Sequence, residues 1–264
     1  MKKTKKTIKS FLQSRFVKKG LWTLLAFLFL IVAWAIVSLL IGNGYLFPDI
    51  SKTFVVAFGL LAKGEFWLAF LSTLARSLSA FFVSFIVATG LAVLAYIFPV
   101  FEKFFAPIIS FFRSLPTMAV LLIILLWTNP SLAPIFVTGL VLTPLSYASV
   151  YSALDGVDKD LIELSVVYRV PKSKRIKQLF LPSVLPQVCE EGARNLSFSL
   201  KLIVSAEIMS NTFQSVGGQM QSAALYDQTA LLFALTLFVF LTGYALECLG
   251  LVACKLLFAG VRGE

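Results

Sequence analysis

Charged side chains interrupt the long apolar stretches of this sequence and are its first candidates for chemistry. If these stretches cross a membrane, an unpaired charge within them costs on the order of a few kcal/mol, so each group needs an opposite charge or water. They are Arg76, Arg113, Arg194, Lys201, Glu207 and Glu247. Arg76, Arg194 and Glu247 fall near the ends of apolar stretches. We therefore expect them to form structural ion pairs or to reach towards the membrane surface.

Arg113 and Lys201 fall nearer the middle of apolar stretches. Pro107 and Pro116 flank Arg113 and should break the helix locally, which frees backbone polar groups. Broken helices at membrane depth usually line cavities, so we expect Arg113 and Lys201 to face a path for an anionic or strongly polar solute. Glu207 belongs to the same candidate path, and the sequence leaves open a loosely spaced pair between Glu207 and Lys201.

The residues that enzymes and metal sites use are largely missing. The sequence has no histidine, no Gly-x-Ser-x-Gly motif and no phosphate-binding loop that ends in Gly-Lys-Ser or Gly-Lys-Thr. Cys189, Cys248 and Cys254 show neither metal-ligand spacing nor a paired disulfide framework, so we expect all of them to serve as packing residues. We therefore expect neither an enzyme nor a cofactor in this chain. ATP-driven work would require another polypeptide.

The composition is that of an integral membrane protein. Of the 264 residues, 59% are hydrophobic and 14% are charged, and the mean hydropathy is +0.91. The segment from Leu21 to Ile41 carries no charge and, at about 1.5 Å per residue, would span roughly 30 Å of hydrocarbon. This run is longer than the apolar region of about 7 to 15 residues in a secretory signal. It therefore predicts a retained first membrane helix.

The net charge of +10 is concentrated beside apolar stretches. Lysine and arginine gather in residues 1–19 and 159–177. This is the pattern of cytoplasmic segments in membrane proteins, and it favours contact with membrane lipid over binding to nucleic acid. We expect a basic cytoplasmic N-terminus at 1–19, followed by a single transmembrane domain at 20–264.

The apolar stretches predict an all-α bundle of about six membrane helices. After the first helix, residues 42–71 are expected to lie outside and to be partly helical. The later spans are expected near 73–97, 104–127, 131–154, 184–210 and 229–253, with Glu102 and Lys103 in a short cytoplasmic link. Six crossings would place both termini and the loop 155–178 on the cytoplasmic side of the cell membrane.

The loop 155–178 carries its own helical pattern. Apolar residues recur at intervals of three and four, acidic residues precede them, and a basic run follows. The apolar positions are Val157, Leu161, Leu164, Val167 and Tyr168. A short surface helix with one apolar face needs a partner. That partner could be a soluble subunit, the lipid headgroup layer or the bundle itself.

This loop resembles the cytoplasmic signature of permeases from binding-protein-dependent ATP-binding cassette (ABC) importers. That signature reads Glu-Ala-Ala, three residues, Gly, nine residues, Ile, one residue and Leu-Pro. At the same spacing the chain has Glu163, Arg169 for the glycine, Leu179, and Leu181-Pro182. Leu164 and Ser165 replace the alanines, and Val170-Pro171 is expected to supply the turn that the glycine would allow.

The resemblance implies a type I importer fold and a coupling helix, with a coupling loop at 155–182 that docks on an ATPase subunit. The residues that it assigns to this contact are Glu163, Tyr168, Arg169, Leu179, Leu181 and Pro182. It also implies two copies of the ATPase, which holds the ATP, an external solute-binding protein and a second permease copy in a homodimer. The location would be a bacterial inner membrane.

A narrower resemblance points to permeases of the nitrate, sulfonate, taurine and bicarbonate type. It rests on the segment 112–116, on Gly192 and Arg194, on Ala206-Glu207 and on Gly217-Gly218, whereas Lys201 stands where that group commonly has tryptophan. Gly217 and Gly218 could form an ordinary turn, an external gate or a seat for the binding protein. Permeases for vitamin precursors are similar too, so the solute stays open.

Two functions of other classes remain as alternatives. A secondary transporter or channel would act without an ATPase, but such proteins often show repeated sets of spans, and no repeat is evident here. A membrane scaffold would use the loop only to recruit a partner.

Overall fold

The computed structural model describes residues 15–44 and 46–258, so most of the basic segment 1–19 lies outside the described residues. Within the described part the chain is helical and has no strand, which confirms the all-α prediction. The elements are α2 (Arg15–Ile41), α3 (Ile50–Leu61), α4 (Gly64–Ile97), α5 (Pro99–Ser114), α6 (Thr117–Leu125), α7 (Ala133–Asp155), α8 (Lys159–Val167), α9 (Lys172–Arg175), a π-helical turn (Ile176–Phe180), α10 (Leu181–Ser210), α11 (Val216–Leu225) and α12 (Thr229–Phe258).

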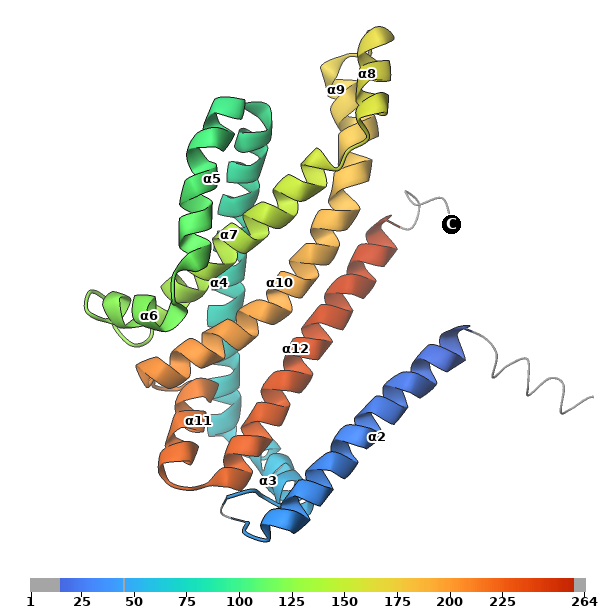
Figure 1. The fold of residues 1–264 in the computed structure, drawn as a ribbon. Helices are drawn as coiled ribbons and strands as arrows, with labels where there is room; N and C mark the ends of the chain where they lie inside the picture. The colour runs from blue at the N-terminus through green and yellow to red at the C-terminus, as the bar shows by residue number, and fades with distance from the viewer. Residues whose placement is uncertain (1–14, 45, 259–264) are drawn as a thin grey trace, which may run out of the picture.

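The bundle has two distinct ends (Figure 1). One end carries α8, α9, the α4–α5 turn and the end of α12, and we refer to it as the α8 end. The opposite end carries α3, α6 and α11, and we refer to it as the α11 end. Among the described residues, α4, α7 and α12 are long and apolar enough to cross a membrane, and α5 with α6 would form a further, bent span.

The other two predicted spans are α2 and α10, and α10 is the more polar. Its buried face includes Asn195, Ser197 and Ser199. The Asn195 side-chain amide donates to Ser146 Oγ on α7 at 3.2 Å, and the hydroxyls of Ser199 and Ser77 on α4 lie 2.7 Å apart. These polar groups are bonded between helices, which explains how a polar helix can lie within the bundle.

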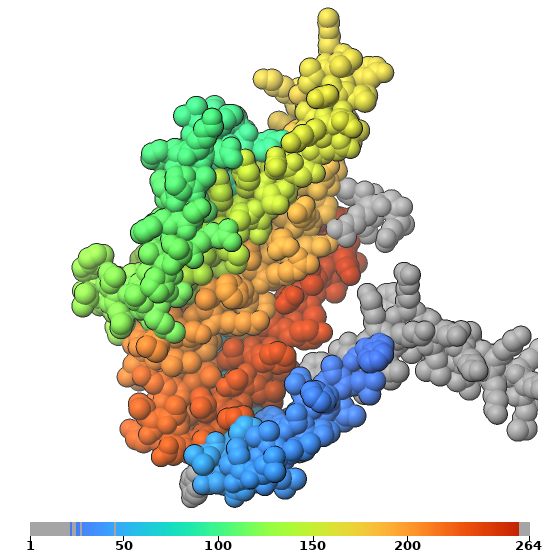
Figure 2. Space-filling view, viewed as in Figure 1, coloured from blue at the N-terminus to red at the C-terminus, as the bar shows by residue number. Residues whose placement is uncertain are grey.

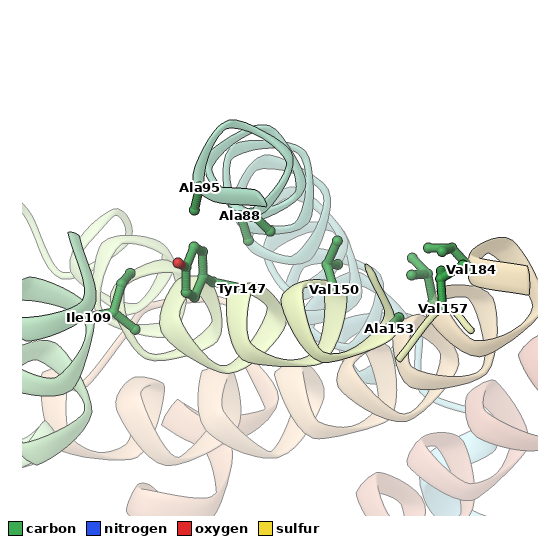
Figure 3. Close-up of a cluster of buried hydrophobic side chains, with 10 residues drawn as sticks. Ala88, Ala95, Ile109, Tyr147, Val150, Ala153, Val157 and Val184 are labelled. Carbon is green, nitrogen blue, oxygen red and sulfur yellow. The ribbon is translucent and has the colours of Figure 1, made fainter. Parts of the chain in front are cut away.

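Small side chains let α4, α7 and α10 pack closely. Ala88, Ala92 and Ala95 of α4 are almost completely buried. Figure 3 shows Ala88 and Ala95 beside Tyr147 and Val150 of α7. The same cluster extends to Ile109 on α5 and to Val157 and Val184 near the α8 end. Since alanine keeps the backbones close, this cluster forms a dense junction between the helices.

The prediction of a single helix at 104–127 is wrong, because this stretch is divided between α5 and α6, which meet at a bend of 90°. Pro116 disfavours the helical conformation at the preceding residue, and Leu115 is extended with ψ 131°. Pro107, in contrast, lies inside α5 without ending it, so the expected break there does not occur. Glu102 and Lys103 lie in α5 and do not form a link, because Phe98 alone separates α4 from α5.

The first described helix, α2, is attached at the α11 end. Trp34 Nε1 donates to the Pro48 carbonyl at 3.1 Å, and Ser38 Oγ donates to Asp49 at 2.9 Å. The hydrogen bond from Ser38, followed by that from Lys52, lowers the pKa of the Asp49 carboxyl. The Trp34 ring also packs on Phe233 of α12 with centroids 5.6 Å apart. In the space-filling view α2 lies at the side of the bundle and meets it near α3 (Figure 2).

The expectation of three unpaired packing cysteines is wrong, because a disulfide joins Cys189 on α10 to Cys254 on α12. The two Cα atoms lie 5.8 Å apart, and Cys248 is free. Nearby, a Cβ at Gly250 would lie 2.6 Å from the Ala193 Cβ, so the two helices touch where glycine leaves room. The two bonded cysteines are 65 positions apart in the sequence, so their spacing gave no signal.

The end of α8 is a Schellman motif. Arg169 adopts φ 51°, the Arg169 N–H donates to the Val166 carbonyl at 2.9 Å, and the Val170 N–H donates to the Ser165 carbonyl at 2.9 Å. Glycine is the usual residue at this left-handed position. The turn expected at Val170-Pro171 therefore occurs at Arg169 itself, the position where the resembled signature has glycine.

We expect only Cys248 to react with an alkylating reagent in the unfolded, unreduced chain, because the disulfide blocks the other two sulfur atoms. Mass spectrometry of the peptides, with and without prior reduction, measures this. Alkylation of Cys189 before reduction would contradict the pairing.

At Arg169, the Gly variant should be more stable than the Val variant by about 1–2 kcal/mol, because a β-branched side chain is disfavoured at positive φ. Thermal unfolding of the detergent-solubilised protein checks the order. Lys159→Gly and Lys159→Val, at the regular first turn of α8, are the control pair and should lack this preference. Equal stability of the two Arg169 variants would count against the left-handed assignment.

Candidate functional site

The α8 end carries an exposed segment that projects beyond the rest of the bundle (Figure 1). Asp158 caps α8, since its side chain accepts a hydrogen bond from the Asp160 N–H at 2.9 Å. No residue of α8, α9 or the π-helical turn is buried. Val167 and Tyr168 are 77% and 75% exposed. Leu161 and Leu164 are exposed as well, so the bundle buries Val157 but leaves the other four residues of the predicted apolar face uncovered.

The predicted contact residues divide into a tip and a base. Glu163, Tyr168 and Arg169 are exposed at the tip, and the structure gives Glu163 no ion pair with another described residue. Leu179 packs on the cluster of Ala88, Tyr147 and Val184, while Leu181 and Pro182 begin α10. The base of the segment is thus joined to the helix core, and its tip is free.

A second candidate site lies at the α11 end, around a buried carboxylate. Glu207 on α10 is 0% exposed, and Arg76 on α4 donates to its Oε1 at 2.9 Å. Thr73 Oγ1 donates to Glu207 Oε2 at 2.9 Å, and the Gly217 N–H donates to the same oxygen at 3.2 Å. Three helices, α4, α10 and α11, therefore meet at this carboxylate.

Thr73 completes this network. Its hydroxyl oxygen accepts a hydrogen bond from the Val216 N–H at 2.9 Å. Ser215 caps the start of α11 by accepting from the Gly218 N–H at 2.8 Å. The first N–H groups of a helix have no partner within the helix. Here those of residues 216 and 217 are bonded to side chains of α4 and α10.

Gly217 and Gly218 are required by the close contact of α11 with its neighbours. A Cβ at position 217 would lie 2.4 Å from the Glu207 Cβ and 2.7 Å from the Val204 carbonyl oxygen. At position 218 it would lie 2.2 Å from the Thr212 carbonyl oxygen. Helix α11 could therefore not lie in this place with a larger residue at either position.

A cavity of about 730 Å³ opens beside α11. It is lined by residues at the start of α4, by Gly218, Gln219 and Ser222 of α11, and by the loop 211–215. Its lining mixes polar side chains and the charged Lys63 and Glu65 with apolar ones such as Phe66 and Phe213.

Other intramembrane charges lie apart from this network. Arg113 and Lys201 are exposed and form no ion pair with a described residue. The sequence left open a pair between Glu207 and Lys201, but Glu207 pairs with Arg76. Arg194 pairs with Glu191 within α10, as expected for a structural ion pair. The pairing of Arg76 with Glu207 was missed, although both fall near the same end of antiparallel spans.

Comparisons with known proteins agree with this fold. The family described as "Binding-protein-dependent transport system inner membrane component" matches residues 84–250. No curated protein sequence matches the chain.

Solved ABC transporter structures share the architecture. A crystal structure of an amino acid ABC transporter with histidines matches with a TM-score of 0.61 at 12% identity. The match covers 71% of this chain and 91% of that one. The methionine transporter MetNI, described in inward-facing conformations, matches with a TM-score of 0.59 at 18% identity, over 72% and 95% of the two chains. The family match covers more than half of the sequence, so the chain belongs to the inner membrane permease components of ABC importers.

Proposed function

We propose that the chain works as the permease of an importer that contains two copies of it and two ATPase subunits and that receives solute from an external binding protein. In this arrangement α8 lies on the cytoplasmic side of a bacterial inner membrane, together with both termini, and α11 lies outside. The observation that carries the proposal is the exposed apolar tip of the segment 155–182, which the bundle leaves without a partner.

A soluble subunit is the best partner for this tip. Val167 and Tyr168 are exposed on a segment that projects away from the bundle, beyond the α4–α5 turn (Figure 1). Exposed aromatic and aliphatic side chains of this kind are typical of protein contacts. The exposed Glu163 carboxylate adds a group that can accept a charge-assisted hydrogen bond from the ATPase. ATP and its hydrolysis would belong to that subunit, so this chain itself would not be an enzyme.

The base of the segment is suited to transmit motion. Val157 and Val184 belong to the buried cluster, and Leu179 and Phe180 pack against it. The Phe180 ring also lies 5.9 Å from the Tyr96 ring on α4. Because packed interiors move as units, a displacement of the docked tip would be carried to α4, α7 and α10.

The solute is proposed to be small and either anionic or strongly polar. Arg113 and Lys201 are exposed positive side chains on apolar-flanked helices, and positive charge in a confined path attracts anions. Nitrate, a sulfonate, taurine, bicarbonate or a vitamin precursor would fit this class. Glu207 would act on the path indirectly, since its carboxylate is buried within one protomer.

The Glu163→Ala variant should bind less of the ATPase subunit encoded beside this chain. We expect a loss on the order of tenfold, the size of effect that a central contact has at a protein interface. Co-purification from solubilised membranes measures it. Glu65→Ala, which removes an exposed carboxylate at the α11 end, is the matched control and should keep the ATPase. If the wild-type chain retains no ATPase, the proposed function is wrong.

The double variant Arg113→Gln with Lys201→Gln lacks both exposed positive charges. It should take up an anionic solute about tenfold more slowly or worse, because focusing by positive charge raises association rates by at least that factor. Uptake into cells as a function of solute concentration measures this. Lys255→Gln, an exposed lysine at the end of α12, serves as the control. Unchanged uptake and preference would remove these two residues from the path.

A further inference from the structure

The stability of the fold does not by itself require an ion pair at the buried position of Arg76 and Glu207. A buried ion pair loses about as much solvation energy as its attraction returns, so apolar residues of similar size are often as stable. Burial of Glu207 without partners would be strongly unfavourable, and the structure avoids this with hydrogen bonds from Arg76, Thr73 and Gly217. Such a network fixes one arrangement of the helices that it joins, because only that arrangement satisfies every group.

The element that the network fixes is α11. The N–H groups of Val216 and Gly217, at the positive end of this short helix, are bonded to Thr73 and Glu207. A carboxylate at this end also interacts favourably with the helix dipole. If α11 moved away, both N–H groups would lose their partners together. The contact is therefore either made or broken and has no stable intermediate position.

The glycine contacts, like the hydrogen bonds, fix the position of α11 against α10. Gly217 lies directly on the Glu207 side chain at Cβ and on the backbone of Val204 and Ile208, so α11 touches α10 beside the carboxylate. The other face of α11 supplies Gly218, Gln219 and Ser222 to the wall of the external cavity. The position of α11 therefore determines the width of that cavity. The Arg76 side chain is 16% exposed, whereas that of Glu207 is fully buried.

We propose that Glu207, through its pair with Arg76, is the positioning residue that holds α11 in the closed position of an external gate. This inference rests on the proposed function, since the gate belongs to a transporter. The closed gate is the state in which Glu207 bonds to Arg76, Thr73 and the α11 N-terminus. In the open gate α11 leaves this seat and the cavity between α4 and α11 widens.

The test measures the distance across the cavity. Spin labels are attached at Glu65→Cys and Ser222→Cys, two exposed positions in the cavity lining, one at the start of α4 and one on α11. The chain also carries Cys248→Ser, so that no native free cysteine among the described residues reacts. The full chain is reconstituted in nanodiscs, and the label distance is recorded by pulsed electron resonance. Between the two labels of one copy, the parent should give one short distance. Glu207→Gln should add a longer one, with a rise in the open population of about tenfold.

Further variants separate gating from folding. Thr73→Val keeps the ion pair but removes the bonds to Glu207 and Val216, and it should also populate the longer distance. Arg76→Lys keeps the charge and should stay close to the parent. Glu191→Gln removes a carboxylate that pairs with an arginine on the same helix, so it is the matched control and should leave the distance unchanged. If Glu207→Gln does not fold, Thr73→Val carries the test.

The outcomes are distinct from those of the proposed function. An unchanged distance in Glu207→Gln and Thr73→Val, or an equal change in Glu191→Gln, overturns the role of Glu207. A lower melting temperature with an unchanged distance also overturns it, because the pair would then be structural only. The label distance is measured on the permease itself. A wild-type chain that binds no ATPase would therefore reject the importer while leaving the effect of Glu207 on α11 measurable.

Discussion

Close packing of small side chains between α4, α7 and α10 is the constraint on which the rest of the structure depends. Ala88, Ala92 and Ala95 allow the backbones to approach, and serines on α4 and α10 bond across the contact. Larger side chains would separate the helices and open voids that neither lipid nor water fills well. Both candidate sites are attached to this junction, one at each end of the same helices.

This placement gives α10 a special part in the molecule. Its first turns continue the exposed segment through the π-helical turn, and its last turns carry Glu207. A helix is stiff along its axis, so a change at one end of α10 is felt at the other through its packing against α4 and α7. The proposed docking tip and the proposed gate are therefore two ends of one packed element.

The sequence predicted much of the fold because apolar runs and turn residues are local signals. It predicted helices throughout, a separate helix in the loop 155–178 and a turn near residues 127–130. It failed where distant residues decide the outcome. The disulfide joins residues 65 apart, and Arg76 meets Glu207 across 131 residues, so no local pattern shows either contact. The bend at Pro116 was signalled, but its angle depends on how α6 packs against α7 and α10.

Backbone strain is concentrated at the same two ends. Among the described residues other than glycine, positive φ occurs at Arg169 in the exposed segment and at Asn211, Gln214 and Asp227 in the loops at the α11 end. Asparagine and aspartate tolerate this conformation, but arginine and glutamine bear a cost of about 1 kcal/mol each. Such strain persists only where neighbouring contacts over-determine the backbone, and it is most common at sites that bind or switch. At Arg169 the Schellman hydrogen bonds hold the turn, and near Gln214 the capped start of α11 holds the loop. The backbone is thus unstrained through the helices and strained near the two proposed sites. This observation supports both sites independently of their charges.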